Sequence, residues 1–188
     1  VILSDINFNL NSGQSITITG PNGVGKTLLL NTIVGFKSIF KGKISINKIN
    51  LSNDPSNRQE HIGYYGHKAS IHTGLTVMET IEYWKAYYSS DANTSELIKF
   101  WDLPNKTVES CSEGQRKRLA LVRLSLMNRN IWILDEPTTN LDFVGKKKFL
   151  ELHTSHLRAG GLSIITSHEP AQVKGHKIIN LERHSGKN

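Results

Sequence analysis

The chain has 188 residues, of which 37% are hydrophobic, and carries a formal net charge of +7. This length and composition suit one full-sized core, so we expect a single domain. The only cysteine, Cys111, excludes an internal disulfide framework and fits a reducing compartment. No apolar run approaches the roughly 20 residues that cross a bilayer, and we read no signal peptide, so we expect a soluble protein. The charge fits anionic lipid, nucleic acid or nucleotide, and composition does not choose among them.

The first residues read as β structure. The chain begins at Val1, without an initiator methionine and inside a strand-like segment, so we expect that natural sequence precedes it. Residues 5–10 alternate polar and apolar side chains, which is typical of an antiparallel strand with one wet face. The turn at 11–13 then predicts a hairpin with the short, β-branched strand 15–19.

A glycine-rich loop follows that strand and matches the phosphate-binding pattern G-x-x-x-x-G-K-[ST]. The apolar stretch 28–34 after it reads as the start of a buried helix, and strand, loop and helix together are the context that the motif requires. A chance match in a glycine-rich turn is the alternative, and these flanks argue against it. The residues expected to bind nucleotide here are Gly20, Pro21, Asn22, Gly23, Val24, Gly25, Lys26, Thr27 and Leu28.

The residue types of this loop explain the expected chemistry. Glycines let the backbone curl around a phosphate and aim successive N–H groups at its oxygens, and the helix that starts near Gly25 adds the positive end of its dipole. Lys26 offers an ammonium to the outer phosphates, and the Thr27 hydroxyl is placed to ligate Mg²⁺.

In the middle of the chain, β-type segments and a polar stretch are followed by a helical region. A strand is expected at 43–46, and the polar stretch 47–59, rich in turn formers, reads as a surface loop. A short strand at 62–65 follows. From 76 to 109 the spacing becomes helical, with a second helical patch at 94–101, and these residues read as a small helical insertion. Its aromatic side chains are interpreted as packing or, alternatively, as a partner-docking surface: Tyr83, Trp84, Tyr87, Tyr88 and Trp101.

The last third of the chain carries the acidic residues of the expected site. A helix over 116–127 precedes the apolar strand 131–134, which ends in Asp135 and Glu136. Asp135 can orient Mg²⁺ directly or through water, and Glu136 can polarise a water for in-line attack on a γ-phosphate. An exposed helix start is the alternative for such an acidic pair. A polar turn at 138–142, a helix towards Leu157 and a buried strand at 162–166 complete the pattern.

These motifs, in this order, resemble the ATP-binding cassette of ABC proteins over essentially the whole chain. The matching elements are Gly20–Thr27 (Walker A), 111–115 (the signature loop, usually L-S-G-G-Q), Ile131–Asp135 (Walker B), 140–142 (the D-loop) and His168 (the switch histidine). The resemblance implies an α/β fold of the P-loop NTPase class. It also implies one domain, 1–188, with an N-terminal antiparallel β part and a helical subdomain at about 74–128 inserted in a RecA-like core.

The signature loop lies at a helix start, where backbone N–H groups and the helix dipole make a phosphate site. In the resembling family this site faces the γ-phosphate held by a second subunit, so ATP joins two copies and hydrolysis releases them. Ser112, Gly114 and Gln115 are the residues to which this role carries over. Cys111 and Glu113 depart from the usual pattern, and a carboxylate at Glu113 suits the helix dipole but not a nearby γ-phosphate.

A second departure lies at His67, where the family usually has the Q-loop glutamine. Imidazole can still hydrogen-bond a metal-bound water, but its charge depends on pH. This substitution makes the resemblance more specific, together with the helical insertion and the sequences of 118–124 and 131–137. The chain resembles the ATP-binding subunits of the haem exporter of cytochrome c biogenesis. Two further departures are 68–70, where members usually have Gln-Pro-Gly, and Thr138, where an aromatic residue is common.

The resemblance implies a peripheral ATPase subunit on the cytoplasmic face of the inner membrane. Two copies would close on two Mg-ATP and drive an integral membrane permease subunit. Glu136, His168 and Lys26 are the expected catalytic residues, and Thr27 and Asp135 the metal ligands. We assign no adenine-stacking residue, and we expect His153 and His156 at the surface rather than in a haem site.

Other readings of the same cassette stay open. An importer or another exporter would change the cargo but not the chemistry. An ABC ATPase acting on ribosomes or nucleic acid is prompted by the basic charge, but such proteins usually carry two cassettes or long inserted arms, so we expect no nucleic-acid partner. A non-hydrolysing regulator is the last alternative, and the intact Glu136 argues against it.

Overall fold

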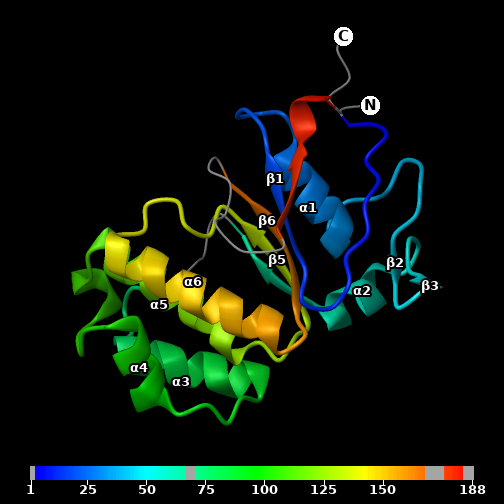
Figure 1. Cartoon of the computed structure of the whole chain (residues 1–188). Helices are drawn as coiled ribbons and strands as arrows, with labels where there is room; N and C mark the ends of the chain where they lie inside the picture. Colours follow the sequence, from blue (N-terminus) through cyan, green and yellow to red (C-terminus); the bar gives the residue numbers. More distant parts are fainter. Residues whose placement is uncertain (1–2, 67–70, 168–175, 184–188) are drawn as a thin grey trace. The chain divides into compact units, whose positions relative to one another are not determined.

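The computed structural model describes residues 3–66, 71–167 and 176–183 (Figure 1). They divide into two compact units, the first made of 1–64, 129–137 and 156–188 and the second of 65–128 and 138–155. The strands are β1 (Ser15–Thr19), β2 (Ser45–Ile46), β3 (Ile49–Asn50), β4 (Ile62–Tyr65), β5 (Ile131–Asp135), β6 (Leu162–Thr166) and β7 (His176–Asn180). The helices are α1 (Lys26–Val34), α2 (Pro55–His61), α3 (Val77–Tyr88), α4 (Thr94–Trp101), α5 (Glu113–Leu126) and α6 (Phe143–Arg158), with 3₁₀ turns η1 (Val108–Ser110) and η2 (Leu181–Arg183).

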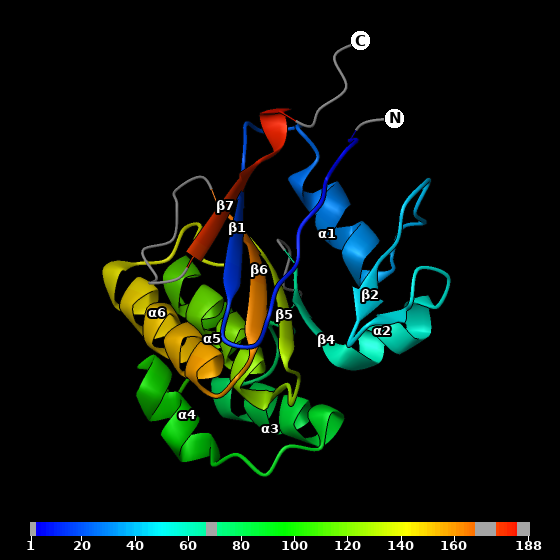
Figure 2. The same ribbon diagram turned by 45° about the vertical axis from the view of Figure 1, so that its right-hand side comes forward.

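The first unit is built on a five-stranded sheet in the order β4-β5-β6-β1-β7 (Figure 2). The pairs β1–β6, β1–β7 and β5–β6 are all parallel. A separate two-stranded antiparallel sheet joins β2 and β3. The fold is therefore α/β with a small antiparallel part, as the sequence predicts.

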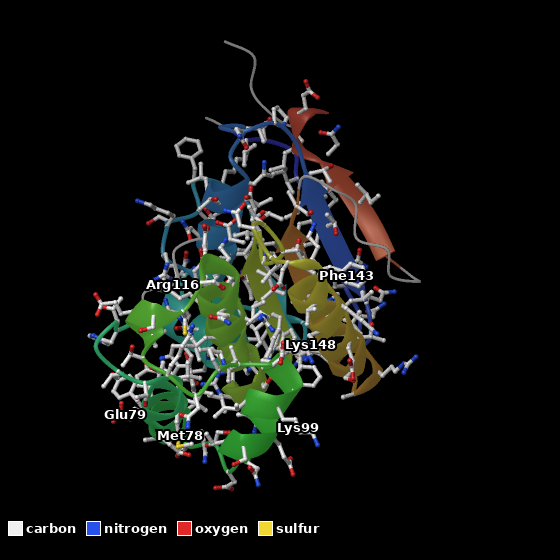
Figure 3. All side chains as sticks on the ribbon, turned by 90° about the vertical axis from the view of Figure 1, so that its left-hand side faces the viewer. Met78, Glu79, Lys99, Arg116, Phe143 and Lys148 are labelled. Atoms are coloured by element: carbon white, nitrogen blue, oxygen red, sulfur yellow. The ribbon has the colours of Figure 1, made fainter. Side chains whose placement is uncertain are left out.

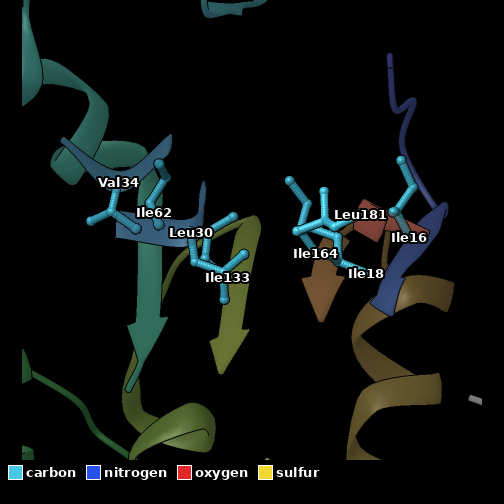
Figure 4. Close-up of a cluster of buried hydrophobic side chains, with 8 residues drawn as sticks. All are labelled: Ile16, Ile18, Leu30, Val34, Ile62, Ile133, Ile164 and Leu181. Atoms are coloured by element: carbon cyan, nitrogen blue, oxygen red, sulfur yellow. The ribbon is translucent and has the colours of Figure 1, made fainter. Parts of the chain in front are cut away.

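The core of this unit lies between the sheet and α1 (Figure 4). Leu30 and Val34, one helical turn apart on α1, are buried with Ile62 of β4 and Ile133 of β5. The remaining members of the cluster are Ile16, Ile18, Ile164 and Leu181. Full burial of such side chains contributes about 1.5–3 kcal/mol each, so the helix that follows the phosphate loop is held firmly on the sheet.

Two local predictions in the first unit were wrong. Residues 5–10 form no strand and no hairpin with β1, because both edges of β1 are taken by β6 and β7. The apolar side chains of 5–10 instead pack against the core cluster. The expected surface loop 47–59 contains β3 and most of α2, which continues to His61. Helix α2 begins where the Asp54 side chain accepts a hydrogen bond from the Asn57 N–H and Pro55 occupies the first turn. Strand β7 was not predicted.

The second unit is helical. Thr76 and Glu79, the latter labelled in Figure 3, form a capping box at the start of α3, and α4 spans the predicted residues 94–101. Helices α3, α4 and α5 pack on one another. Trp84 and Trp101 are buried, which confirms packing for these two aromatics, whereas Tyr83 and Tyr87 are exposed.

Surface placement was wrong for His153 on α6, whereas His156 on the same helix is partly exposed. Phe149, His153 and Leu157 recur every four residues, lie on one face of the helix and are all buried, with His153 only 1% exposed. The ring of His156 stacks on Trp132, with centroids 3.7 Å apart. Burial lowers the pKa of His156, and its backbone hydrogen bonds oppose that shift. Among the described residues, no group of three or more His, Cys, Asp or Glu side chains could hold a metal ion.

Candidate functional site

The phosphate loop joins β1 to α1 in a conformation that depends on glycine. Gly20, Gly23 and Gly25 all have positive φ, at 147°, 80° and 109°. A Cβ on Gly20 would lie 2.9 Å from a methyl group of Val24, and Gly25 caps α1 in the left-handed region. The backbone curl predicted from the sequence is therefore present, directly before a helix N-terminus.

Lys26 is the first residue of α1, and its side chain folds back over the loop. Its Nζ donates to the carbonyl oxygens of Gly20, at 2.7 Å, and Pro21, at 3.3 Å. The residue is only 6% exposed. The loop carbonyls thus hold one largely desolvated ammonium, and the attraction of such a charge to an anion is stronger than in bulk water.

The two predicted metal ligands meet at the end of β5. The Thr27 hydroxyl donates to Oδ2 of Asp135 at 2.8 Å, and Asp135 is 2% exposed. A hydroxyl and a carboxylate are the hard oxygen donors that Mg²⁺ prefers, and Mg²⁺ usually takes only one or two carboxylates together with substrate phosphates. The donor set therefore fits Mg²⁺ bound jointly with a nucleotide.

A third residue, Thr166, connects Asp135 to Glu136. Thr166 is the last residue of β6 and is paired in register with Asp135 on β5. Its Oγ1 donates to Oδ1 of Asp135 at 2.6 Å and accepts from the backbone N–H of Glu136 at 2.9 Å. Glu136 has φ 49°, a left-handed conformation that is costly for a non-glycine residue. Sequence reasoning placed Thr166 on a strand but gave it no role, because only the register of two distant strands reveals it.

The signature segment belongs to the second unit and is organised as a helix cap. The Ser112 hydroxyl accepts from the Gln115 N–H at 3.2 Å, and the Gln115 side chain accepts from the Ser112 N–H at 3.0 Å. These two bonds form a capping box at the start of α5. Gly114 lies in the first turn of the same helix, so the three predicted residues share one helix N-terminus.

The D-loop contacts the signature helix inside the same unit. Asn140 donates to a carboxylate oxygen of Glu113 at 3.3 Å, and Lys117 donates to the Thr139 carbonyl at 2.8 Å. The Oδ1 atom of Asp142 accepts a hydrogen bond from the Gly145 N–H at 2.7 Å, and its Oδ2 atom lies 3.7 Å from a guanidinium nitrogen of Arg118. Sequence reasoning identified the two segments but not these contacts between them.

Two predicted site residues, His67 and His168, lie outside the described residues. The residues predicted for the phosphate loop, the metal and the attacking water, Gly20–Leu28, Asp135 and Glu136, belong to the first unit. Ser112, Gly114 and Gln115 belong to the second. Within the first unit the structure brings the phosphate loop and the end of β5 into direct contact through the bond between Thr27 and Asp135.

Comparison with known proteins agrees with this geometry. The family model described as "ABC transporter" matches residues 3–139. The "Cytochrome c biogenesis ATP-binding export protein CcmA" of Histophilus somni is 35% identical and covers 98% of this chain and 88% of its own. The protein of the same name from Escherichia coli K12 is 32% identical, with 96% and 88% covered.

Solved structures share the fold. A putative ABC transporter ATP-binding protein from Pyrococcus furiosus superimposes with a TM-score of 0.84 and 25% identity, covering 98% of this chain and 92% of its own. The ATP-binding cassette MJ0796, solved as a dimer in a post-hydrolysis state with ADP and Pi, gives 0.72 at 24% identity, with 89% and 80% covered.

Proposed function

Because the chain belongs to the ABC transporter family, we propose that it is the ATP-hydrolysing subunit of an exporter that serves cytochrome c biogenesis. Its near-full-length relatives carry the name of an ATP-binding export protein of that process. The observation that carries the proposal is the contact between Thr27, next to the phosphate-loop lysine, and the buried Asp135. That contact supports the proposal because it brings the residue next to the phosphate-loop lysine together with the acidic residue expected to hold the metal.

Each residue has a distinct task in this proposal. Lys26 and the loop N–H groups hold the triphosphate, and Thr27 with Asp135 holds Mg²⁺. When bound with ATP, Mg²⁺ neutralises charge on the phosphate oxygens. Glu136 accepts a hydrogen bond from the attacking water and orients it towards the γ-phosphate. His168 is proposed to contact the γ-phosphate and His67 a metal-bound water.

The proposal includes a second copy of the chain. The cassette MJ0796 forms a dimer in a solved structure, which supports pairing of two copies. We propose that Ser112, Gly114 and Gln115 of one copy complete the nucleotide site of the other. The capping box at 112–115 supports this role because it presents a helix N-terminus, which attracts anions. Residues 74–128 are proposed as the helical subdomain of the cassette.

The remaining partner is proposed to be an integral membrane permease. Among the described helices, none is both long and apolar enough to cross a bilayer. The curated relatives are named as ATP-binding proteins of an export system, which supports a separate membrane subunit, with this chain attached peripherally at the cytoplasmic face of the inner membrane. The proposed task of this assembly is the handling of haem or of a haem chaperone.

The substitution Glu136→Gln tests the mechanism. It preserves size and hydrogen bonding but removes the base, so turnover should fall by roughly 100-fold or more, while ATP binding persists and a dimer accumulates on gel filtration. Glu151→Gln, at an exposed position on α6, is the matched control and should behave as wild type. Hydrolysis at the wild-type rate by Glu136→Gln would contradict the assigned base.

Purification of the tagged chain from membranes tests the assembly. We expect an integral multi-helix subunit to co-purify, and its identification by mass spectrometry would define the transporter. Recovery of ribosomes or nucleic acid in its place would favour a non-transport ABC ATPase.

A further inference from the structure

We propose that Thr166 is a positioning residue for ATP hydrolysis: its hydroxyl sets both the metal-holding carboxylate of Asp135 and the backbone of Glu136. The inference rests on the proposed function, since it concerns the same site. Its basis is the pair of hydrogen bonds that one buried hydroxyl makes to two adjacent acidic residues. Thr166 is completely buried.

The chemistry of a hydroxyl fixes the direction of both bonds. A threonine hydroxyl has one proton to donate and lone pairs to accept with. The carboxylate of Asp135 can only accept and the Glu136 N–H can only donate, so the Thr166 proton goes to Oδ1 of Asp135. With Oδ1 held at 2.6 Å, Oδ2 is the oxygen that lies 2.8 Å from the Thr27 hydroxyl. Thr166 thereby selects which carboxylate oxygen is presented with Thr27.

The second bond supports a strained backbone. Glu136 is held at φ 49°, and such a conformation costs on the order of 1–3 kcal/mol for a non-glycine residue. The bond from its N–H to Thr166 fixes the peptide that leads into this turn. Without it, the turn can relax, and the Glu136 carboxylate would then leave the position from which it orients water.

Threonine is well suited to this place on the sheet. Its branched Cβ restricts χ1, so the hydroxyl direction is set by the strand itself. Serine would keep both hydrogen bonds with more rotamer freedom, whereas valine would keep the shape and leave a buried carboxylate oxygen and a buried N–H without this partner. The two substitutions therefore separate hydroxyl chemistry from packing.

The same sheet offers a matched control. Thr17 on β1 is also completely buried, and its Oγ1 has no hydrogen-bond partner among the described residues. It is paired in register with Ile165, the residue before Thr166. Thr17→Val thus removes a buried hydroxyl one strand away without touching either acidic residue.

The experiment compares Thr166→Val, Thr166→Ser and Thr17→Val with wild type, using a fluorescent ATP analogue titrated with and without Mg²⁺ and steady-state hydrolysis of ATP. For Thr166→Val we expect the affinity for the nucleotide without Mg²⁺ to stay near wild type. The Mg²⁺ concentration that gives half-maximal nucleotide binding should rise, or kcat should fall, by about 10–100-fold, which is the usual effect of removing a hydrogen-bond partner of a metal ligand. KM for ATP should change little. Thr166→Ser should recover most of the loss, and Thr17→Val should match wild type.

Three results would overturn the inference: a wild-type Mg²⁺ response and kcat in Thr166→Val, an equal loss in Thr166→Ser, or an equal loss in Thr17→Val. Should the valine variant not fold, Thr166→Cys, which keeps the size but weakens both hydrogen bonds, provides the same comparison. Absence of hydrolysis in the wild-type chain would count against the proposed function alone, because the Mg²⁺ titration measures the role of Thr166 without turnover.

Discussion

The phosphate loop with its acidic partner and the signature segment are positioned in different ways. In the first unit, Lys26 and Asp135 are 6% and 2% exposed. Carbonyls of the glycine-rich loop hold the Lys26 ammonium, and the register of β5 with β6 sets Thr166 beside Asp135. In the second unit, Ser112 and Glu113 are exposed at the start of a helix, held by a capping box and one side-chain contact. Lys26 and Asp135, proposed to hold phosphate and metal, are thus buried and held by the loop and the sheet, whereas the residues proposed to meet a second copy are held by local contacts and are at least partly exposed to solvent.

The largest effect is expected in the first unit, for the loss of the Lys26 side chain. Lys26→Ala deletes the ammonium that the loop carbonyls hold in place, and a hydrogen bond to a charged group contributes about 1.5–3 kcal/mol. We expect ATP affinity to fall by up to about 100-fold, measured by isothermal titration calorimetry. Lys41→Ala, at an exposed position, is the control. Unchanged affinity in Lys26→Ala would remove the phosphate-loop assignment.

The candidate site could be assembled from the sequence wherever its residues are contiguous in the chain. The phosphate loop is a single run of residues, and Asp135 with Glu136 directly follows an apolar strand, so a local pattern contained both. Thr166 was not predictable, because its role depends on the register that pairs β5 with β6, 31 residues apart. No local pattern carries that information.

The fold shows the same division. A helix or strand was predicted where its own residues show a helical spacing of apolar side chains or a short apolar run. This holds for α3, α4, β1, β4, β5 and β6. The alternation at 5–10 was misleading, since it indicates two faces but not an available neighbouring strand. Helix α2 was missed although Asp54 and Pro55 are a local start signal, because the polar composition of the segment suggested a loop.

In the second unit, the largest effect is expected for Arg118, which anchors the signature helix. Its guanidinium donates to the carbonyls of Trp101 and Asp102 and to the Asp102 carboxylate, and its side chain is 7% exposed. Arg118→Met should lower the free energy of unfolding by about 2 kcal/mol, because buried carbonyls lose their donor. Urea denaturation followed by circular dichroism measures it. Arg116→Met, a half-buried neighbour (Figure 3), should change stability much less, and equal losses would refute the anchoring role.

A smaller effect is expected at the helix cap itself. Ser112→Ala removes the oxygen that accepts from the Gln115 N–H, and such a loss costs about 1 kcal/mol. Because Ser112 is also proposed to complete the site of the second copy, ATP-driven dimerisation of a Glu136→Gln background should weaken as well. Ser112→Asp restores the cap but adds a negative charge, so it should recover stability and not dimerisation. Recovery of both by Ser112→Asp would mean that Ser112 serves only as a cap.

The smallest effect is expected at Glu113, where one substitution should change stability and dimerisation in opposite directions. Its carboxylate lies in the first turn of α5 and accepts from Asn140. Glu113→Gln keeps a hydrogen-bond acceptor but removes the charge, so it should cost about 0.5 kcal/mol of stability through the lost dipole interaction. The same change should strengthen ATP-driven dimerisation by a few fold, because it removes a negative charge from the segment proposed to face the triphosphate of the second copy. Sedimentation velocity measures that gain, with Glu109→Gln as the exposed control. The difference should shrink as salt screens the charge, and a gain that does not depend on salt would show that electrostatic repulsion is not its cause.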